Sequence, residues 1–260
     1  MSDQHVYDDE QAERLAAIYT APATVDRRER MLELLDLEAG ESVLSIGCGP
    51  GYEPEALAEA VGEGGQVHGI DNSEEVLAMA ADHCEEYPQV TLEHANAADL
   101  AVEDDSFDAA VASLVYEYSP AVDQAVAELQ RALRPGGRAA LISTDWESTV
   151  WHSSDADRMD RAIEAFTDIY ANPRLGSQLT SHLSGGGLTV EHVEPYSNLA
   201  TDLDGYAGLI LPLIKGQLEE DEAFEKSEVE AWERDLRVLD EAGETFFNLT
   251  YYLYIARNPG

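Results

Sequence analysis

The chain has 260 residues, of which 44% are hydrophobic and 26% are charged, which is enough to bury the core of one large domain and excludes a disordered or fibrous protein. It carries 53 Asp and Glu against 15 Lys and Arg, a formal net charge of -38, so its field repels polyphosphates and anionic lipid headgroups. We therefore expect neither nucleic acid nor an acidic membrane as a partner.

The apolar periodicity of the first half predicts a repeating pattern of strands and helices. Two amphipathic helices are expected at 3–20 and 24–37, followed by a short apolar strand at Ser42–Ile46. Four further strands are expected at 66–70, 90–94, 107–114 and 138–144, separated by helices at 53–61, 73–86 and 120–134. The turn at 134–137 is expected to end the last of these helices. Such alternation predicts a parallel sheet covered on both faces.

The second half changes rhythm. Helices are expected at 155–171, 174–183, 203–216 and 219–242, with a glycine turn at 185–187, a strand at 188–196 and a final strand at 245–256. The predicted fold class is α/β, a Rossmann-like, doubly wound and mostly parallel sheet of seven strands. We expect one domain over residues 1–260, with a helical cap at 1–40, a cofactor-binding core at 41–150, a substrate side at 151–243 and the final strand at 244–257.

Cysteine usage and apolar segments indicate the compartment. The 2 cysteines, Cys48 and Cys84, are too few for a disulfide framework and stand in no Cys-x-x-Cys cluster. The N-terminal region lacks the apolar core of a signal peptide, and the longest strongly apolar stretch, 206–214, is about half of a bilayer-spanning length. We therefore expect a cytoplasmic protein that does not enter a membrane.

A glycine-rich segment carries the strongest functional signal. The sequence V-L-S-I-G-C-G-P-G, residues 43–51, runs from an apolar strand into three glycines and then a helix. Glycines let a ligand approach the backbone, and a helix N-terminus offers unpaired N–H groups. The next strand ends at Asp71, whose carboxylate can accept both hydrogen bonds of a ribose diol. A plain tight turn and a helix-capping Asp71 are the simpler alternatives.

The glycine spacing separates two classes of nucleotide-binding loop. A dinucleotide fingerprint requires G-x-G-x-x-G, but position 52 here is Tyr. The arrangement resembles motif I of the class I S-adenosylmethionine-dependent methyltransferases, in the branch of ubiquinone and menaquinone biosynthesis enzymes. The likeness extends over about residues 40–145, because H-A-N-A-A-D-L, S-F-D-A-A-V-A-S-L-V-Y-E-Y and L-R-P-G-G-R match later motifs of that family in order.

The resemblance implies S-adenosylmethionine as the cofactor and assigns the residues that would hold it. The glycine loop would pass beside the methionine part of the cofactor, Asp71 would bind the ribose, and Asn72 would lie beside the adenine. The implied cofactor-binding residues are Gly47, Cys48, Gly49, Gly51, Asp71, Asn72, Asn96, Ala97 and Ser113. Ser45 departs from the pattern, since relatives usually carry Asp or Glu there and serine supplies no charge.

The carboxyl ends of the fourth and fifth strands supply candidates for the acceptor side, because ligands of open parallel sheets bind there. The catalytic candidates are Tyr116, Glu117 and His152, and the substrate candidates are Tyr118, Asp145, Trp146 and Trp151. Each has a structural alternative: the aromatic side chains suit a core, and the acid and the histidine suit a surface. The chain offers no metal-ligand spacing, and we expect no required metal.

The first functional hypothesis is methyl transfer to a small, apolar or aromatic molecule. An NAD-dependent oxidoreductase is the second, because it shares the strand, the glycine loop and the acid, and a non-catalytic cofactor-binding or interaction protein is the third. The excess of acid also resembles the surfaces of proteins from halophiles, in which concentrated cations screen self-repulsion. The acceptor, the attacking atom and the oligomeric state remain open.

Overall fold

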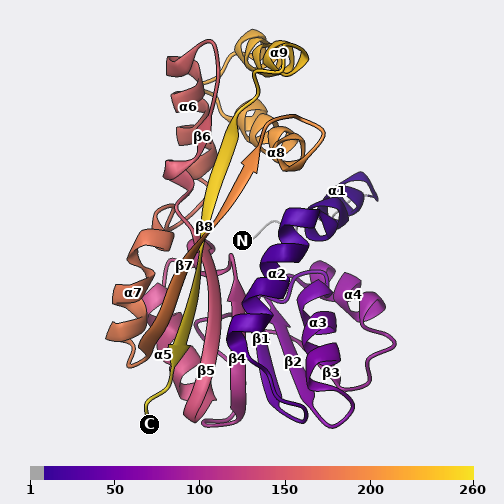
Figure 1. Cartoon of the computed structure of the whole chain (residues 1–260), viewed down its shortest axis with the longest axis vertical. Coiled ribbons are helices and arrows are strands. Elements are labelled where there is room, and N and C mark those ends of the chain that lie inside the picture. The colour runs from indigo at the N-terminus through magenta and orange to yellow at the C-terminus, as the bar shows by residue number, and fades with distance from the viewer. Residues whose placement is uncertain (1–8) are drawn as a thin grey trace.

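The computed structural model describes residues 9–260, which build one mixed sheet with helices on both faces (Figure 1). The strands follow the order β3-β2-β1-β4-β5-β8, and β7 and β6 also pair with β8. The first five strands run parallel, whereas β8 is antiparallel to its three neighbours. The strands are β1 Ser42–Ile46, β2 Gln66–Asp71, β3 Val90–His94, β4 Phe107–Ser113, β5 Leu133–Thr144, β6 Val150–Trp151, β7 Thr189–Ala200 and β8 Phe247–Arg257.

The α/β class is therefore confirmed, but the count of seven strands is wrong. The sheet has 8 strands, because Val150 and Trp151 form an extra two-residue strand against β8. So short a segment carries no periodicity of its own, and only its pairing with Phe247 and Asn248 defines it.

The helices agree in order with the prediction. They are α1 Asp9–Thr20, α2 Pro22–Leu35, α3 Tyr52–Val61, α4 Glu74–His83, α5 Val122–Ala132, α6 Ala156–Thr167, α7 Leu175–Gly185, α8 Tyr206–Glu220 and α9 Lys226–Glu241, with 3-10 turns at Tyr116–Tyr118 and Trp146–Ser148. The start of the first predicted helix, residues 3–8, lies outside the described residues. The turn at 134–137 does not end α5, which already stops at Ala132; it lies inside β5, where the register with β4 shifts.

Strand alternation divides the core into two layers. On β1, Val43 belongs to the cluster that packs against α2 and α3, and Leu44 to the cluster that packs against α5 and α7. The same alternation continues across β4, β5 and β8. The central strands are thus buried on both faces. Only the end of the sheet formed by their carboxyl ends is left uncovered by these two layers.

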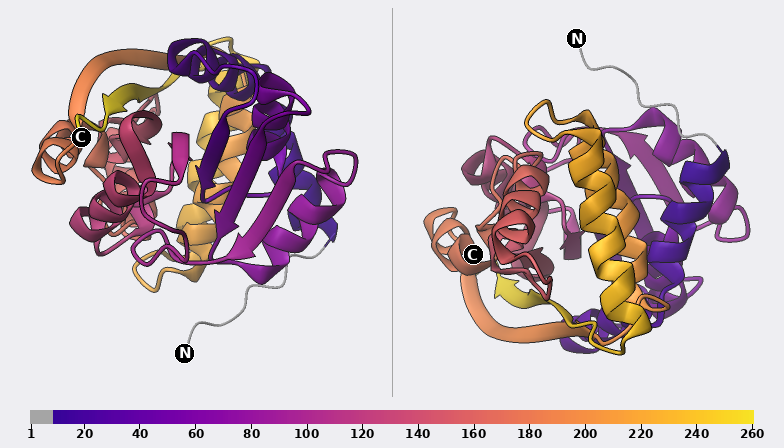
Figure 2. Two further views of the ribbon diagram at one scale, coloured as in Figure 1. Left: turned by 90° about the horizontal axis from the view of Figure 1, so that it is seen from below. Right: turned by 90° about the horizontal axis from the view of Figure 1, so that it is seen from above.

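The late part of the chain covers that end of the sheet. Strands β7 and β8 are 12 and 11 residues long and extend beyond the parallel strands, where α6, α8 and α9 gather above them (Figures 1 and 2). Helix α8 contacts α6, α9 and α1, so both early and late segments meet there. Within residues 9–260, no helix combines the length and the apolar character that a bilayer crossing requires.

Candidate active site

A cavity of about 1170 Å³ lies at the carboxyl ends of β1, β2 and β4. Its floor comes from the loops after these strands, and its walls come from α1, α2, α6 and α8. The sequence-predicted residues that line it are Gly47, Gly49, Asp71, Asn72, Asn96, Ala97, Ser113, Tyr118 and Trp146. Segments far apart in the chain therefore share one space.

Asp71 organises the glycine loop. One carboxylate oxygen accepts a hydrogen bond from the Gly49 N–H at 3.0 Å, and the other accepts one from the Ser73 N–H at 3.0 Å. Each oxygen keeps a second lone-pair direction, because an ionised carboxylate can accept about four hydrogen bonds. The side chain at the end of β2 thus fixes the loop and still presents acceptors to the cavity.

Two glycines of the loop occupy positions that a larger residue could not. Gly47 and Gly49 have positive φ angles of 65° and 58°, a region that favours glycine. A Cβ atom on Gly47 would lie 2.4 Å from the Val115 side chain, and one on Gly49 would lie 2.6 Å from the Tyr19 hydroxyl. The Val115 and Tyr19 side chains therefore pack closely over these two glycines, and α1 reaches over the loop through Tyr19.

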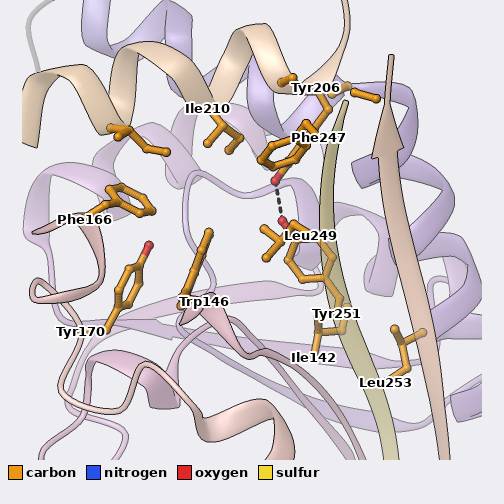
Figure 3. Close-up of a cluster of buried hydrophobic side chains, with 14 of the residues drawn as sticks. Ile142, Trp146, Phe166, Tyr170, Tyr206, Ile210, Phe247, Leu249, Tyr251 and Leu253 are labelled. Atoms are coloured by element: carbon orange, nitrogen blue, oxygen red, sulfur yellow. Dashed lines mark hydrogen bonds between the residues drawn. The ribbon is translucent and has the colours of Figure 1, made fainter. Parts of the chain in front are cut away.

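An aromatic wall forms the opposite side of the cavity. Trp146 and Tyr170 stack with their ring centroids 4.9 Å apart, and Phe166 meets both rings edge-on. Figure 3 shows these side chains in one cluster with Tyr206 and Tyr251, whose hydroxyls are 2.6 Å apart. This wall presents flat apolar surfaces to whatever lies above the glycine loop.

The comparison with known families fits this geometry. Residues 44–141 match the family described as a methyltransferase domain, a segment that runs from β1 into β5 and contains both the glycine loop and Asp71. Residues 44–141 of the chain therefore carry a methyltransferase domain.

Relatives of the domain have both assigned and unassigned activities. The chain is 35% identical over 189 residues to an uncharacterized protein of Streptomyces fradiae, covering 72% of this chain and 55% of the relative. It is 32% identical over 117 residues to the demethylmenaquinone methyltransferase of Bacillus licheniformis, covering 45% of this chain and 50% of that enzyme. The chain thus spans about half the length of the curated relatives that it matches.

A solved structure shares the architecture of almost the whole chain. Phosphoethanolamine N-methyltransferase 2 of Haemonchus contortus, in complex with S-adenosyl-L-methionine, superposes with a TM-score of 0.64 at 19% identity. The match covers 99% of this chain and 59% of that chain. At this identity, the likeness supports the fold and nothing more specific.

Two of the expected cofactor residues lie beside the cavity and do not line it. Cys48 is buried with its side chain next to Gly69, and burial raises the pKa of its thiol. Gly51 caps α3 and packs against Ala80 and His83. Cys48 therefore packs against β2 and Gly51 against α4, and both shape the turn that presents the loop.

The expected catalytic side chains do not reach the cavity. Tyr116 is buried in the core on the α5 side, and His152 is exposed on the far side of β6. Of the substrate candidates, Asp145 accepts a hydrogen bond from the Ser177 hydroxyl, and Trp151 packs in the core against Phe247 at 4.8 Å. None of these four residues lines this cavity: Tyr116 and Asp145 lie at the 3-10 turns after β4 and β5, and the pairing of β6 with β8 places Trp151 in the core. Their assignment to the acceptor site stays a prediction.

Glu117 is the fifth predicted catalytic or substrate residue that does not line the cavity, and it is 1% exposed. One of its carboxylate oxygens accepts hydrogen bonds from the Ser143 hydroxyl at 2.7 Å and the Thr144 N–H at 3.0 Å. Its other oxygen has no partner. Glu117 therefore ties the 3-10 turn after β4 to the end of β5.

Burial should make this acid a source of pH-dependent stability. Burial raises the pKa of Glu117 to about 7, against hydrogen bonds from Ser143 and Thr144 that lower it. The folded protein then holds the proton more tightly than the unfolded chain, so the free energy of unfolding falls as pH rises from about 4.5 to 7.

We expect Glu117→Gln to reduce this pH-dependent decrease in the free energy of unfolding by about 3 kcal/mol. Urea unfolding at pH 5 and pH 8, at constant salt, measures it for both proteins. The exposed Glu147→Gln is the control, and an unchanged difference between the two pH values in Glu117→Gln would contradict the expectation.

One acid that the sequence did not mark as a site residue also lines the cavity. Glu53, in the first turn of α3, is 7% exposed. Burial raises its pKa to about 7, while the charges of Arg28 and Arg27 and a hydrogen bond with Ser113 oppose that rise. An acid in the first turn of a helix is ordinary in sequence, because it complements the helix dipole. Only the fold shows that this one faces a cavity.

Proposed function

We propose that the protein transfers a methyl group from S-adenosylmethionine to a small, apolar or aromatic molecule. One observation carries the proposal: the glycine loop with Asp71 and the aromatic wall with Trp146 line the same cavity. Methyl transfer requires a cofactor site and an acceptor site that share one space, because the two reactants must meet in line.

The cofactor is S-adenosylmethionine, and the residues that line the cavity fit it. Gly47 and Gly49 line the cavity and would lie beside the methionine part, and the free lone pairs of Asp71 suit the ribose hydroxyls. Asn72, Asn96 and Ala97 line the same end of the cavity and would surround the adenine. When bound, the cofactor supplies an electrophilic sulfonium methyl group.

Glu53 compensates for the missing acid at Ser45. The Ser45 hydroxyl is fully buried and has no hydrogen-bond partner, so it contributes nothing to the cavity. Glu53 places a carboxylate in the cavity close to the glycine loop, within reach of the charge of Arg28. We propose that it faces the amino group of the cofactor, since a buried carboxylate pairs favourably with an ammonium group.

Calorimetric titration at high salt tests the cofactor. S-adenosylmethionine and its demethylated product should both bind, and NAD should not. Tight binding of NAD alone would favour the oxidoreductase alternative and overturn the proposal. This test needs no knowledge of the acceptor.

A second experiment tests the transfer itself. The protein is incubated with a methyl-labelled cofactor and an extract of small metabolites, and we expect a labelled product that partitions into organic solvent. Saturable cofactor binding without any labelled small molecule would favour the non-catalytic alternative. Boiled protein serves as the control.

A further inference from the structure

The wall of the cavity formed by α2 contains a buried arginine without an ion-pair partner. Arg27, on α2, lines the cavity and is 4% exposed. Among residues 15–260, whose side chains the structure describes, its guanidinium forms no ion pair, and its Nε and Nη1 atoms have no hydrogen-bond partner. The Arg27 side chain does hydrogen-bond to Tyr251. An unpaired charge of this kind costs free energy in a folded protein, so its presence points to a ligand.

The surroundings hold the guanidinium in place without neutralising it. Its central carbon lies 4.0 Å above the ring of Tyr251, a cation–π contact. The hydroxyl of Tyr251 is in turn hydrogen-bonded to that of Tyr206, which also lines the cavity (Figure 3). The charge of Arg27 lowers the pKa of Glu53, but no ion pair joins these two residues.

Two further residues that line the same cavity carry buried polar groups without hydrogen-bond partners. The Thr24 hydroxyl, one helical turn before Arg27 on α2, is buried and has no hydrogen-bond partner, and neither has the Trp146 indole N–H. All of these groups can donate, and the arginine and indole groups can do nothing else. A ligand that satisfies them must present oxygen acceptors.

We infer that the acceptor is an aromatic molecule that carries a carboxylate, held by Arg27 with its ring against Trp146 and Tyr170. This inference rests on the proposed function and names the substrate class. The carboxylate would pair with the guanidinium through charge-assisted hydrogen bonds, and the stacked rings would bind the apolar part. With a net charge of -38, the protein as a whole repels anions, so any preference for one must come from a local cation.

A matched pair of probes tests the inference without any variant. Naphthoate and naphthamide have nearly the same shape and differ in charge, and both are titrated by calorimetry into protein saturated with S-adenosylhomocysteine. We expect naphthoate to bind roughly tenfold or more tightly than naphthamide, the size of one hydrogen bond to a charged group. Equal affinities, a preference for the amide, or no binding of either would overturn the inference.

Variants then assign the preference to a residue. Arg27→Met keeps the length of the side chain and should abolish the preference, while Arg30→Gln, which removes a surface arginine paired with Glu194 on the same helix, should keep it. A persistent preference in Arg27→Met would show that Arg27 only packs on Tyr251. Binding of S-adenosylhomocysteine to the unaltered protein is measured in parallel. If S-adenosylhomocysteine does not bind, the proposed function is contradicted. If it binds but naphthoate does not, only this inference is contradicted.

Discussion

Replacing Asp71 by alanine is expected to lower the affinity for S-adenosylhomocysteine about a hundredfold. Each hydrogen bond from a ribose hydroxyl to a carboxylate contributes about 1.5 to 3 kcal/mol, and the geometry leaves one lone-pair direction on each oxygen for such a bond. The substitution also frees the Gly49 N–H that Asp71 holds, so the loop loses its anchor. Calorimetry of the purified variant at high salt gives the change.

Two controls separate the role of Asp71 from a general effect of charge. Asp82→Ala removes the same charge from an exposed position on α4 and should leave the affinity unchanged. Asp71→Asn keeps one acceptor oxygen and should lie between the alanine variant and the unaltered protein. An Asp71→Ala protein that folds and binds S-adenosylhomocysteine with unaltered affinity would refute the assignment of the ribose site.

Trp232→Ala should have the largest effect on stability, a loss of about 3 to 5 kcal/mol in the free energy of unfolding. Trp232 is 1% exposed on α9, and its ring meets that of Trp151 edge-on at 6.1 Å. Trp151 in turn packs on Phe247. These three side chains join the late helices to β6 and β8, so the cavity left by alanine would open the centre of that layer.

Urea unfolding at constant salt measures the loss. Trp232→Phe should cost much less, because it keeps an aromatic ring and removes an indole N–H that has no partner. Val238→Ala, at a position 57% exposed on the same helix, should change little. A loss below about 1 kcal/mol for Trp232→Ala would mean that α9 is not held by this cluster.

The cofactor side was predictable from sequence because its signals are local. Residues 43–51 contain the strand, the glycine loop and the start of the helix in one stretch, and Asp71 ends the next strand. Positive φ angles at Gly47 and Gly49 follow directly from the choice of glycine. The placement of Cys48 and Gly51 was less accessible, because it depends on how α4 packs against the loop.

The aromatic wall and Arg27 were not predictable as parts of one cavity, because no local pattern connects them. Arg27 lies on α2, Tyr170 follows α6 and Tyr206 begins α8, and only the folded sheet brings them to one cavity. Trp146 and Trp151 looked equivalent in sequence, yet the short strand β6 turns Trp151 into the core while Trp146 lines the cavity. Pairing between distant strands determines whether such a side chain lies in the core or lines the cavity, and it also determines where β6 forms. The resemblance of this acidic chain to proteins from halophiles stays a prediction.

Strand β8 has a consequence for how the molecule assembles. It is the last strand in the order of the chain, yet it lies between β5 and β7 and completes both layers of the core. Before residues 247–257 dock, β5 and β7 each expose a row of unpaired backbone groups, the kind of edge that invites pairing with other chains. Because the contacts of β8 with β5 span more than a hundred residues, we expect slow folding and a late intermediate that is prone to aggregate.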